Sequence, residues 1–383
     1  MQAFAGLKVL DFTTTIAGPH CGRLLADLGA DVVKIETAEG DLMRSRPPLR
    51  NGASTSYGQL NAGKRSIVLD LKRAEAVAAA RRLIGGADIV VENYRPGVMK
   101  RLGLDYASVS ADNPRLIFCS ISGYGQTGPA ADKPAYAPVV HATSGYDMAH
   151  IAYHPGRERP DSCGIFTADI VAGTYAFGAI SAALYQRSVT GQGQQLDVSM
   201  FEGMLSLMTV ELQAAQFPMP PKPKRALYGP AATADGFVNI AVASERTFHE
   251  LCKTAGRGWG SDPRFAKYLD RRVNWAEFMD QLEGWTRTMT TNELMDVLER
   301  AGVPAGPYRT VDEALADPQL THRGALQEVH DAGGAFKVLN PAFRMSASET
   351  KAGPRAPALG EHTREVLAAA GYSESEIAKI TGT

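Results

Sequence analysis

The chain has 383 residues, of which 44% are hydrophobic and 21% are charged, the composition of an ordinary globular protein. At roughly 150 residues per domain, this length predicts two or three domains. Because 40 basic residues balance 41 acidic ones, the composition argues against a protein that holds nucleic acid or a membrane surface through its overall charge.

Leader and membrane segments are not expected in this sequence. Its first residues lack the basic and then apolar pattern of a signal peptide. The most apolar long stretch, residues 165–184, contains Asp169 and Tyr175, which favours a core helix over a membrane span. The four cysteines form no C-x-x-C pair, which predicts reduced thiols in a cytoplasmic protein; they are Cys21, Cys119, Cys163 and Cys252.

Strand and helix patterns alternate over the first 200 residues. In chain order they predict a strand at 8–12, a helix at 20–28, strands at 30–35 and 66–71, a helix at 74–83, a strand at 87–91, a short helix at 96–102 and a strand at 116–122. This alternation predicts a doubly wound α/β domain with a parallel sheet. Ligands of such sheets bind beyond the carboxyl ends of the strands, which here are residues 11–19, 35–44, 92–95 and 122–129.

The second half of the chain has a different pattern of expected helices and strands. A helix is expected at 201–214, and the proline-rich run at 217–224 predicts an extended linker. An alternating strand at 237–243 precedes helical patterns at 247–254, 276–286 and 291–302, which together indicate a smaller α+β domain at about 226–325. One or two helices are expected at 359–383, broken at Gly371.

A glycine-rich segment at 123–128, GYGQTG, fits the G-x-G-x-x-G pattern and follows an expected strand. A dinucleotide site would need a helix that opens inside the motif and an acidic residue about 20 positions further on. Pro129 and Pro134 interrupt any such helix, and no following strand ends in an acidic residue. The segment therefore predicts a loop whose backbone approaches a ligand rather than an NAD site.

Asp169 is a lone carboxylate near the start of an apolar helix. Such a group either caps the helix or takes part in chemistry, and the residues alone leave both interpretations open. Ala172 and Gly173 are small and are expected to leave room for a ligand beside the carboxylate. The eight histidines have no metal-ligand spacing, so no metal site is predicted.

Basic residues gather at the expected strand ends. This grouping favours an anionic ligand that carries phosphate over the alternative of an ordinary solvated surface. The residues are Lys64, Arg65, Arg95, Lys100 and Arg101.

Short motifs spread over the first 200 residues are similar to those of the class III CoA-transferases. They are LKVLDF at 7–12, AGP at 17–19, LADLGADVVKIE at 25–36, NAGKRSI at 61–67, VENYRPG at 91–97, GYGQ at 123–126, TGQGQ at 190–194 and DVSM at 197–200. The chain is identified as a member of this family, whose superfamily includes the α-methylacyl-CoA racemases.

The resemblance implies an intertwined, interlocked homodimer. Each chain would have a large Rossmann-like α/β domain at 1–200 that binds CoA, a helix and linker at 201–225, a smaller α+β domain at 226–325, and a segment at 326–383 that returns to the large domain. CoA or acyl-CoA would lie in a cleft between the domains as a substrate, with no tightly bound cofactor. The implied partners are small molecules and a second copy of the chain, with no nucleic acid and no membrane.

The resemblance also implies the chemistry. Asp169 stands at the position of the family's catalytic aspartate, whose carboxylate attacks an acyl-CoA thioester and forms a mixed anhydride. The racemases pair this aspartate with a histidine that follows the glycine loop, and this chain has Tyr136 there. A phenol with a pKa of about 10 is a poor base at neutral pH, which favours a transferase. His141 keeps a 2-methylacyl-CoA racemase as the alternative, and a CoA-binding protein without catalysis is a third.

The remaining site residues are implied in the same way. CoA would be bound by Lys64, Asn93, Tyr94 and Arg101, and the substrate pocket would contain Ile16, Gly125, Gln126, Tyr136 and His141. Ile16 and Thr37 replace a glutamine and an arginine of formyl-CoA transferase. The first replacement indicates a larger and less polar acyl group than that enzyme takes.

Overall fold

The computed structural model describes residues 2–154, 156–160, 162–217, 228–242 and 244–382. They belong to two compact units. Unit 1 contains Met1–Ser144, Cys163–Leu207 and Gln319–Thr383, and unit 2 contains Gly145–Ser162 and Met208–Pro318. The segment expected to be a linker, residues 217–224, lies outside the described residues apart from Phe217.

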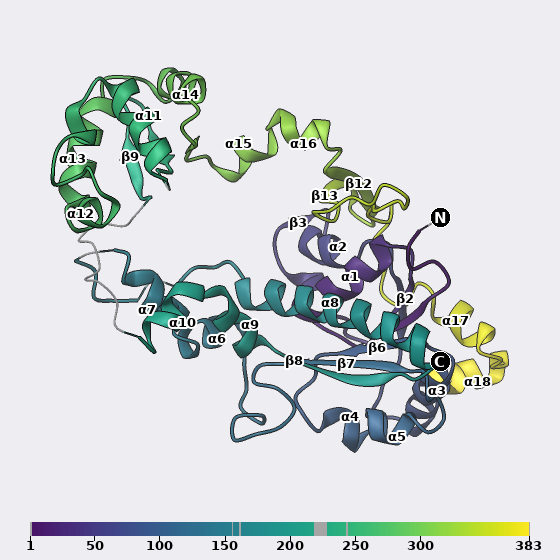
Figure 1. The fold of residues 1–383 in the computed structure, drawn as a ribbon. Coiled ribbons are helices and arrows are strands. Elements are labelled where there is room, and N and C mark those ends of the chain that lie inside the picture. Colours follow the sequence, from purple (N-terminus) through teal and green to yellow (C-terminus); the bar gives the residue numbers. More distant parts are fainter. Residues whose placement is uncertain (1, 155, 161, 218–227, 243, 383) are drawn as a thin grey trace. The chain divides into compact units, whose positions relative to one another are not determined.

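A six-stranded parallel sheet forms the centre of unit 1 (Figure 1). Its strands, in spatial order, are β5 (Arg65–Val68), β2 (Asp31–Glu36), β1 (Lys8–Asp11), β6 (Ile89–Glu92), β7 (Ile117–Ser122) and β8 (Gln194–Ser199). Numbered along the chain, this is the 3-2-1-4-5-6 order of doubly wound α/β folds. The expected parallel α/β sheet is therefore confirmed, and β8 is a strand that the sequence analysis did not predict.

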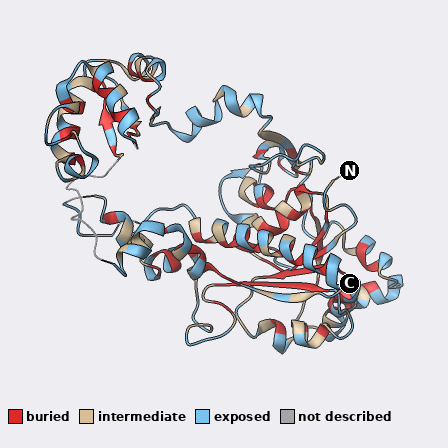
Figure 2. Ribbon diagram, viewed as in Figure 1, coloured by how far each residue is buried: buried red, intermediate tan, exposed pale blue. Residues whose placement is uncertain are grey.

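Helices cover both faces of this sheet, because side chains of alternating strand residues point to opposite faces. Helices α1 (Ala17–Asp27) and α8 (Thr167–Thr190) lie on one face, and α3 (Ala74–Gly85), α4 (Val98–Arg101) and α5 (Tyr106–Val109) lie on the other (Figure 1). The second face also receives α17 (Thr363–Ala369) and α18 (Glu374–Thr381). Buried residues of all these layers appear as the red core in Figure 2.

The segments between these elements complete unit 1. They include η1 (Leu42–Ser45), the hairpin of β3 (Leu49–Arg50) and β4 (Ala53–Ser54), α2 (Thr55–Asn61), α6 (Ala137–Thr143), α9 (Met200–Leu207) and the hairpin of β12 (Leu326–Asp331) and β13 (Gly334–Leu339). The sequence analysis expected one helix at 201–214. The structure instead breaks it at Met208, so that α9 ends at Leu207 in unit 1 and α10 (Thr209–Ala214) belongs to unit 2.

Helix α8 packs with only one side on the sheet. Its small residues, such as Ala172 and Ala176, are buried, whereas Tyr175, Tyr185 and Val189 are exposed. By length and composition it is the one described helix that would fit a membrane span, but core helices of other proteins meet the same criterion, so this is weak evidence. The prediction of a core helix is therefore accurate for one side of α8 only.

Unit 2 combines a small antiparallel sheet with helices. The sheet contains β9 (Pro230–Ala232), β10 (Phe237–Ile240) and β11 (Ala305–Pro307), and the helices are α7 (Tyr146–Ile151), α10, α11 (Glu245–Ala255), η2 (Gly258–Gly260), α12 (Tyr268–Val273), α13 (Trp275–Thr286), α14 (Thr291–Arg300) and α15 (Val311–Leu315). Short α16 (Pro318–His322) spans the boundary between the units along the chain. Aromatic rings fill the core around Phe278, which contacts Phe248, Trp259, Phe265 and Trp275 edge-on or tilted.

Candidate active site

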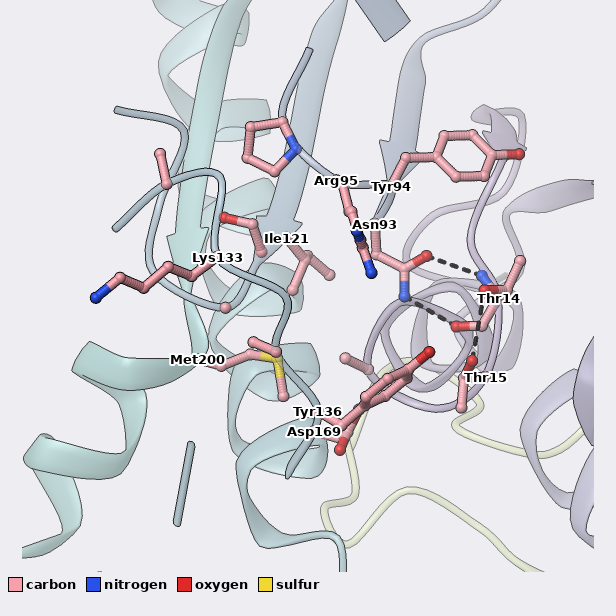
Figure 3. A pocket seen from close by; sticks show the side chains of 16 residues that line it. Thr14, Thr15, Asn93, Tyr94, Arg95, Ile121, Lys133, Tyr136, Asp169 and Met200 are labelled. Carbon is pink, nitrogen blue, oxygen red and sulfur yellow. Dashed lines mark hydrogen bonds between the residues drawn. The ribbon is translucent and has the colours of Figure 1, made fainter. Parts of the chain in front are cut away.

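A pocket of ≈ 240 Å³ opens at the carboxyl ends of β1, β6 and β7 (Figure 3). It is lined by the turn that follows each of these strands, by the start of α8 and by the chain that precedes α6. This is the edge at which a parallel doubly wound sheet binds its ligands. The lining residues used below are Thr14, Thr15, Ala17, Asn93, Tyr94, Arg95, Ser122, Lys133, Tyr136, Asp169 and Met200.

Asp169 is the acidic residue of this pocket and lies in the first turn of α8. Partial burial raises the pKa of its carboxyl to about 6, although hydrogen bonds from the backbone N–H of Ala17 and from its own N–H act in the opposite direction. At neutral pH the group is therefore mostly ionised, but it has lost part of its hydration. A carboxylate in this state is a better nucleophile than one in bulk water.

The turn that carries Ala17 is held from the sheet side by buried charges. The carboxylate of Asp11 accepts the backbone N–H of Thr13 at 2.9 Å, and the ammonium of Lys34 donates to the Thr13 carbonyl at 2.7 Å. Lys34 also forms an ion pair with Asp41, with 2.9 Å between Nζ and Oδ2 and both side chains fully buried. Burial would lower the pKa of Lys34, but the nearby carboxylates of Asp11 and Asp41 outweigh it and raise that pKa.

The next two residues of the turn are held in the same manner. Asn93 accepts the N–H of Thr14 and donates to its carbonyl, both at 2.8 Å (Figure 3). Asp41 accepts the N–H of Thr15 at 3.1 Å. Thr15 has a φ of 70°, a left-handed conformation that is unfavourable for a β-branched residue. The hydrogen bonds from Asn93 and Asp41 hold the turn in this strained conformation. In this conformation the Ala17 N–H points to the carboxylate of Asp169.

Gly173 allows α1 to lie this close to α8. A Cβ atom at this position would be 2.4 Å from the carbonyl oxygen of Ala17, far inside van der Waals contact. The sequence analysis expected the small residues Ala172 and Gly173 to leave room for a ligand. That expectation is wrong for Gly173, because the first turn of α1 occupies the space.

Several predicted site residues line the pocket and others do not. Asn93, Tyr94, Tyr136 and Asp169 come together there. Lys64 is fully buried behind the pocket, where its ammonium donates to Asp11, to the Pro19 carbonyl and to Asn61 at 2.8–2.9 Å. All three of its N–H groups are therefore already used, and burial lowers its pKa to about 8.

The remaining predicted residues do not line the pocket. Ile16 is buried, and Arg101 is exposed at the end of α4. His141 is buried, and its Nε2 accepts the backbone N–H of Ala168 at 3.1 Å, which fixes the start of α8.

The glycine loop is held by β8. The backbone N–H of Gln126 donates to the Asp197 carboxylate at 2.9 Å, and a Cβ atom at Gly125 would be 3.6 Å from the same carboxylate. Gln126 lines a separate cavity of ≈ 180 Å³ beside Glu92.

The sequence analysis missed Thr14, Thr15, Ser122 and Met200 as lining residues. The positions of Thr14, Thr15 and Ser122 at or just beyond the carboxyl ends of strands were the available signal, because the analysis placed ligands at these strand ends. In the described part of the chain there is no cluster of three or more His, Cys, Asp or Glu residues that could hold a metal ion.

Comparison with known proteins places the chain in a family. Residues 4–363 match the model of CoA-transferase family III. The chain is 34% identical to a succinate–glutarate CoA-transferase of Agrobacterium fabrum, covering 95% of this chain and 94% of that protein. It is 35% identical to a succinyl-CoA–D-citramalate CoA-transferase of Chloroflexus aurantiacus, covering 98% and 96%.

A solved structure agrees with these matches. The crystal structure of a CaiB/BaiF family protein from Brucella suis has a TM-score of 0.83 and 34% identity, covering 96% of this chain and 99% of that one. The motifs of the first 200 residues, the parallel sheet and the match over most of the chain thus agree, and the chain belongs to CoA-transferase family III.

Proposed function

We propose that this protein transfers CoA from an acyl-CoA to a free carboxylic acid, with Asp169 as the nucleophile. One observation carries the role of Asp169: it is the only acidic residue among the described residues that line the pocket, and its partly dehydrated carboxylate has a pKa of about 6. The named activities of the relatives from Agrobacterium and Chloroflexus support the reaction class.

The proposed reaction begins and ends with a free Asp169 carboxylate. Its oxygen attacks the thioester carbonyl, the C–S bond breaks, and CoA leaves as the thiolate from an aspartyl mixed anhydride. The thiolate attacks the aspartyl carbonyl, which releases the donor acid as a carboxylate and leaves an aspartyl thioester. The acceptor carboxylate attacks the aspartyl carbonyl and expels CoA as the thiolate, which gives a second mixed anhydride. The thiolate then attacks the acceptor's carbonyl carbon, the C–O bond of the anhydride breaks, and the new acyl-CoA and the free Asp169 carboxylate are formed. No proton is gained or lost overall, so no general base is required.

The surroundings of Asp169 suit this sequence of steps. The Ala17 N–H is positioned to stabilise negative charge on an oxygen at the aspartyl group. Partial burial of Asp169 limits the access of water, which would otherwise hydrolyse the anhydride. Asn93 and Tyr94 border the pocket and Arg101 follows on α4, and we assign these three to the CoA arm. Lys64 supports the pocket from behind, since its ammonium is saturated by protein groups.

The racemase alternative is less well supported. It would need His141 as the second acid/base group beside Asp169. In the structure the Nε2 atom of His141 accepts a backbone N–H, and the side chain is 2% exposed. This geometry favours a role in holding the start of α8, and it does not direct the ring to a substrate in the pocket.

We also propose that a second copy of the chain covers the outer side of α8. Tyr185 and Val189 are 75% and 71% exposed there, and large apolar side chains that gather on one helix side are typical of interfaces. The family resemblance supports an intertwined homodimer. Sedimentation equilibrium should show a dimer, and a monomer would contradict this part of the proposal.

The test of the reaction is covalent labelling of Asp169. The enzyme is mixed with an acyl-CoA and quenched with hydroxylamine, which converts an activated carboxyl to a hydroxamate. Mass spectrometry should find this change on the Asp169 peptide, together with release of CoA thiol. Asp169→Asn should show neither, whereas Asp296→Asn, the same change at an exposed aspartate of α14, should behave as wild type. Full transfer activity in Asp169→Asn would refute the mechanism.

A further inference from the structure

Like any α-helix, α8 begins with backbone N–H groups that have no acceptor within the helix. The N-cap residue, Phe166, makes no side-chain hydrogen bond to them. The N–H of Thr167 donates to the Ile165 carbonyl at 2.9 Å, and the N–H of Asp169 donates to its own carboxylate. Ala168 lies between them and is 0% exposed, so its N–H needs an acceptor from another element.

His141 on α6 supplies that acceptor. Its Nε2 atom accepts the Ala168 N–H at 3.1 Å, and its side chain is 2% exposed. Helix α6 packs against α8. Its buried residues Ala137, Val140 and His141 share one side, because positions three and four apart lie on the same face of a helix. The ring thus reaches the first turn of α8 from a neighbouring helix and caps it in place of the N-cap residue.

This cap affects the nucleophile, because an aspartate in the first turn of a helix is itself an acceptor for such N–H groups. Asp169 follows Ala168 directly, and its carboxylate already accepts its own N–H and that of Ala17. Without His141, the buried Ala168 N–H would stay unpaired unless this carboxylate turned towards it. One more hydrogen bond would stabilise the charge of the carboxylate and make it a weaker nucleophile, turned away from the pocket.

We propose that His141 is a positioning residue, which caps α8 so that the carboxylate of Asp169 is left to face the pocket. His141 would then act through Asp169 and not on the substrate. The sequence left open whether Asp169 caps the helix or takes part in chemistry, and His141 would take the first of these roles. The kinetic test of this role rests on the CoA-transferase function proposed above, whereas the stability test does not.

The kinetic test compares two substitutions of His141. Glutamine ends in an amide oxygen that can accept the Ala168 N–H, whereas leucine fills similar space without an acceptor. Hydroxamate formation at Asp169 is measured over a range of concentrations of an acyl-CoA that labels the wild type, with succinyl-CoA tried first. His141→Leu should lower kcat for labelling by roughly 10-fold, the effect of one lost hydrogen bond, with little change in KM. His141→Gln should keep the wild-type kcat.

The stability test needs no substrate. Unfolding in urea is measured for the wild type, His141→Leu, Asp169→Ala and the double variant. If the Asp169 carboxylate replaces the lost cap, His141→Leu should lower the urea midpoint more in the Asp169→Ala background than in the wild type, because alanine offers no acceptor. His322→Leu, the same change at an exposed position on α16, should leave labelling unchanged.

The outcomes separate this role from a merely structural one. A wild-type kcat in folded His141→Leu, or slow labelling in folded His141→Gln, would overturn the proposal. Equal midpoint losses in the two backgrounds would also overturn it, because His141 would then only support the fold. If leucine prevents folding, His141→Met, which lacks a strong acceptor, takes its place. Unequal midpoint losses without any labelling of the wild type would support the role of His141 and count against the proposed function.

Discussion

Replacing Asp169 by asparagine is expected to stabilise the folded protein while it abolishes the reaction. Folding raises the pKa of this carboxyl from 3.8 to about 6, chiefly through burial. The folded state therefore binds the proton of Asp169 more tightly than the unfolded state does. Stability is lost as the pH rises from about 4 to 6, because the carboxylate must be ionised in a site that disfavours the charge.

The size of this cost follows from the shift. A difference of about two pKa units corresponds to about 3 kcal/mol at about 1.4 kcal/mol per unit. Because Asp169 is only partly buried, solvent screening reduces this to about 2 kcal/mol. Asparagine has nearly the same shape, and its Oδ1 can still accept the N–H of Ala17. The variant should therefore exceed the wild type in free energy of unfolding by about 2 kcal/mol above pH 6.

The assay is urea unfolding of both proteins at several pH values between 4 and 8, at one protein concentration. The difference should be near zero at pH 4, where the wild-type carboxyl is protonated, and should reach its full size above pH 6. Asp296→Asn, at an exposed position, should show no such rise. A variant that is no more stable than the wild type at pH 8, or a difference that does not shrink at pH 4, would refute this account of Asp169.

Two further predictions concern the turn beside Asp169. Asp41→Asn removes one charge of the buried ion pair with Lys34. Unfolding in urea should show a loss of about 3 kcal/mol in the free energy of unfolding, together with slower labelling of Asp169. A loss below about 1 kcal/mol would contradict the role of this pair. Gly173→Ala places a Cβ 2.4 Å from the Ala17 carbonyl and should cost about 1–3 kcal/mol, whereas Gly284→Ala, in a helical position with open space around it, should stabilise by up to about 1 kcal/mol. Equal effects of the two glycine changes on the melting temperature would rule out the clash.

The sheet of unit 1 was predictable where its strands are buried on both faces. The strands β6 and β7 are mainly apolar and β2 contains Val32, Val33 and Ile35, with nearly every residue of the three strands buried, and the sequence analysis found each of them. Strand β8 lies at the edge of the sheet, and its polar residues Gln194, Gln195 and Asp197 are partly or fully exposed. Its sequence therefore lacks an apolar run, and the sequence analysis did not predict it.

The site was predictable to a smaller extent, because burial and long-range contacts are not visible in a sequence. That Asp169 lines a pocket could be anticipated from its place in an apolar helix and from the family motifs. The burial of Lys64, which uses all three N–H groups within the protein, could not. The strained turn at Thr15 depends on Asn93 and Asp41, which are distant in the sequence, so no local pattern indicated it.

The composition of the unit 1 core has a consequence for the order in which the chain can fold during synthesis. One face of the sheet is closed by Val366, Leu367, Ile377 and Ile380, which pack with residues as early as Leu10. Helices α3–α5 can cover part of that face early, but a growing chain cannot complete the cover until residues near 380 have left the ribosome, whereas unit 2 is complete once Pro318 is available. We expect the part of the nascent sheet under α17 and α18 to stay exposed until the end of translation, where chaperones that shield apolar surfaces can bind it.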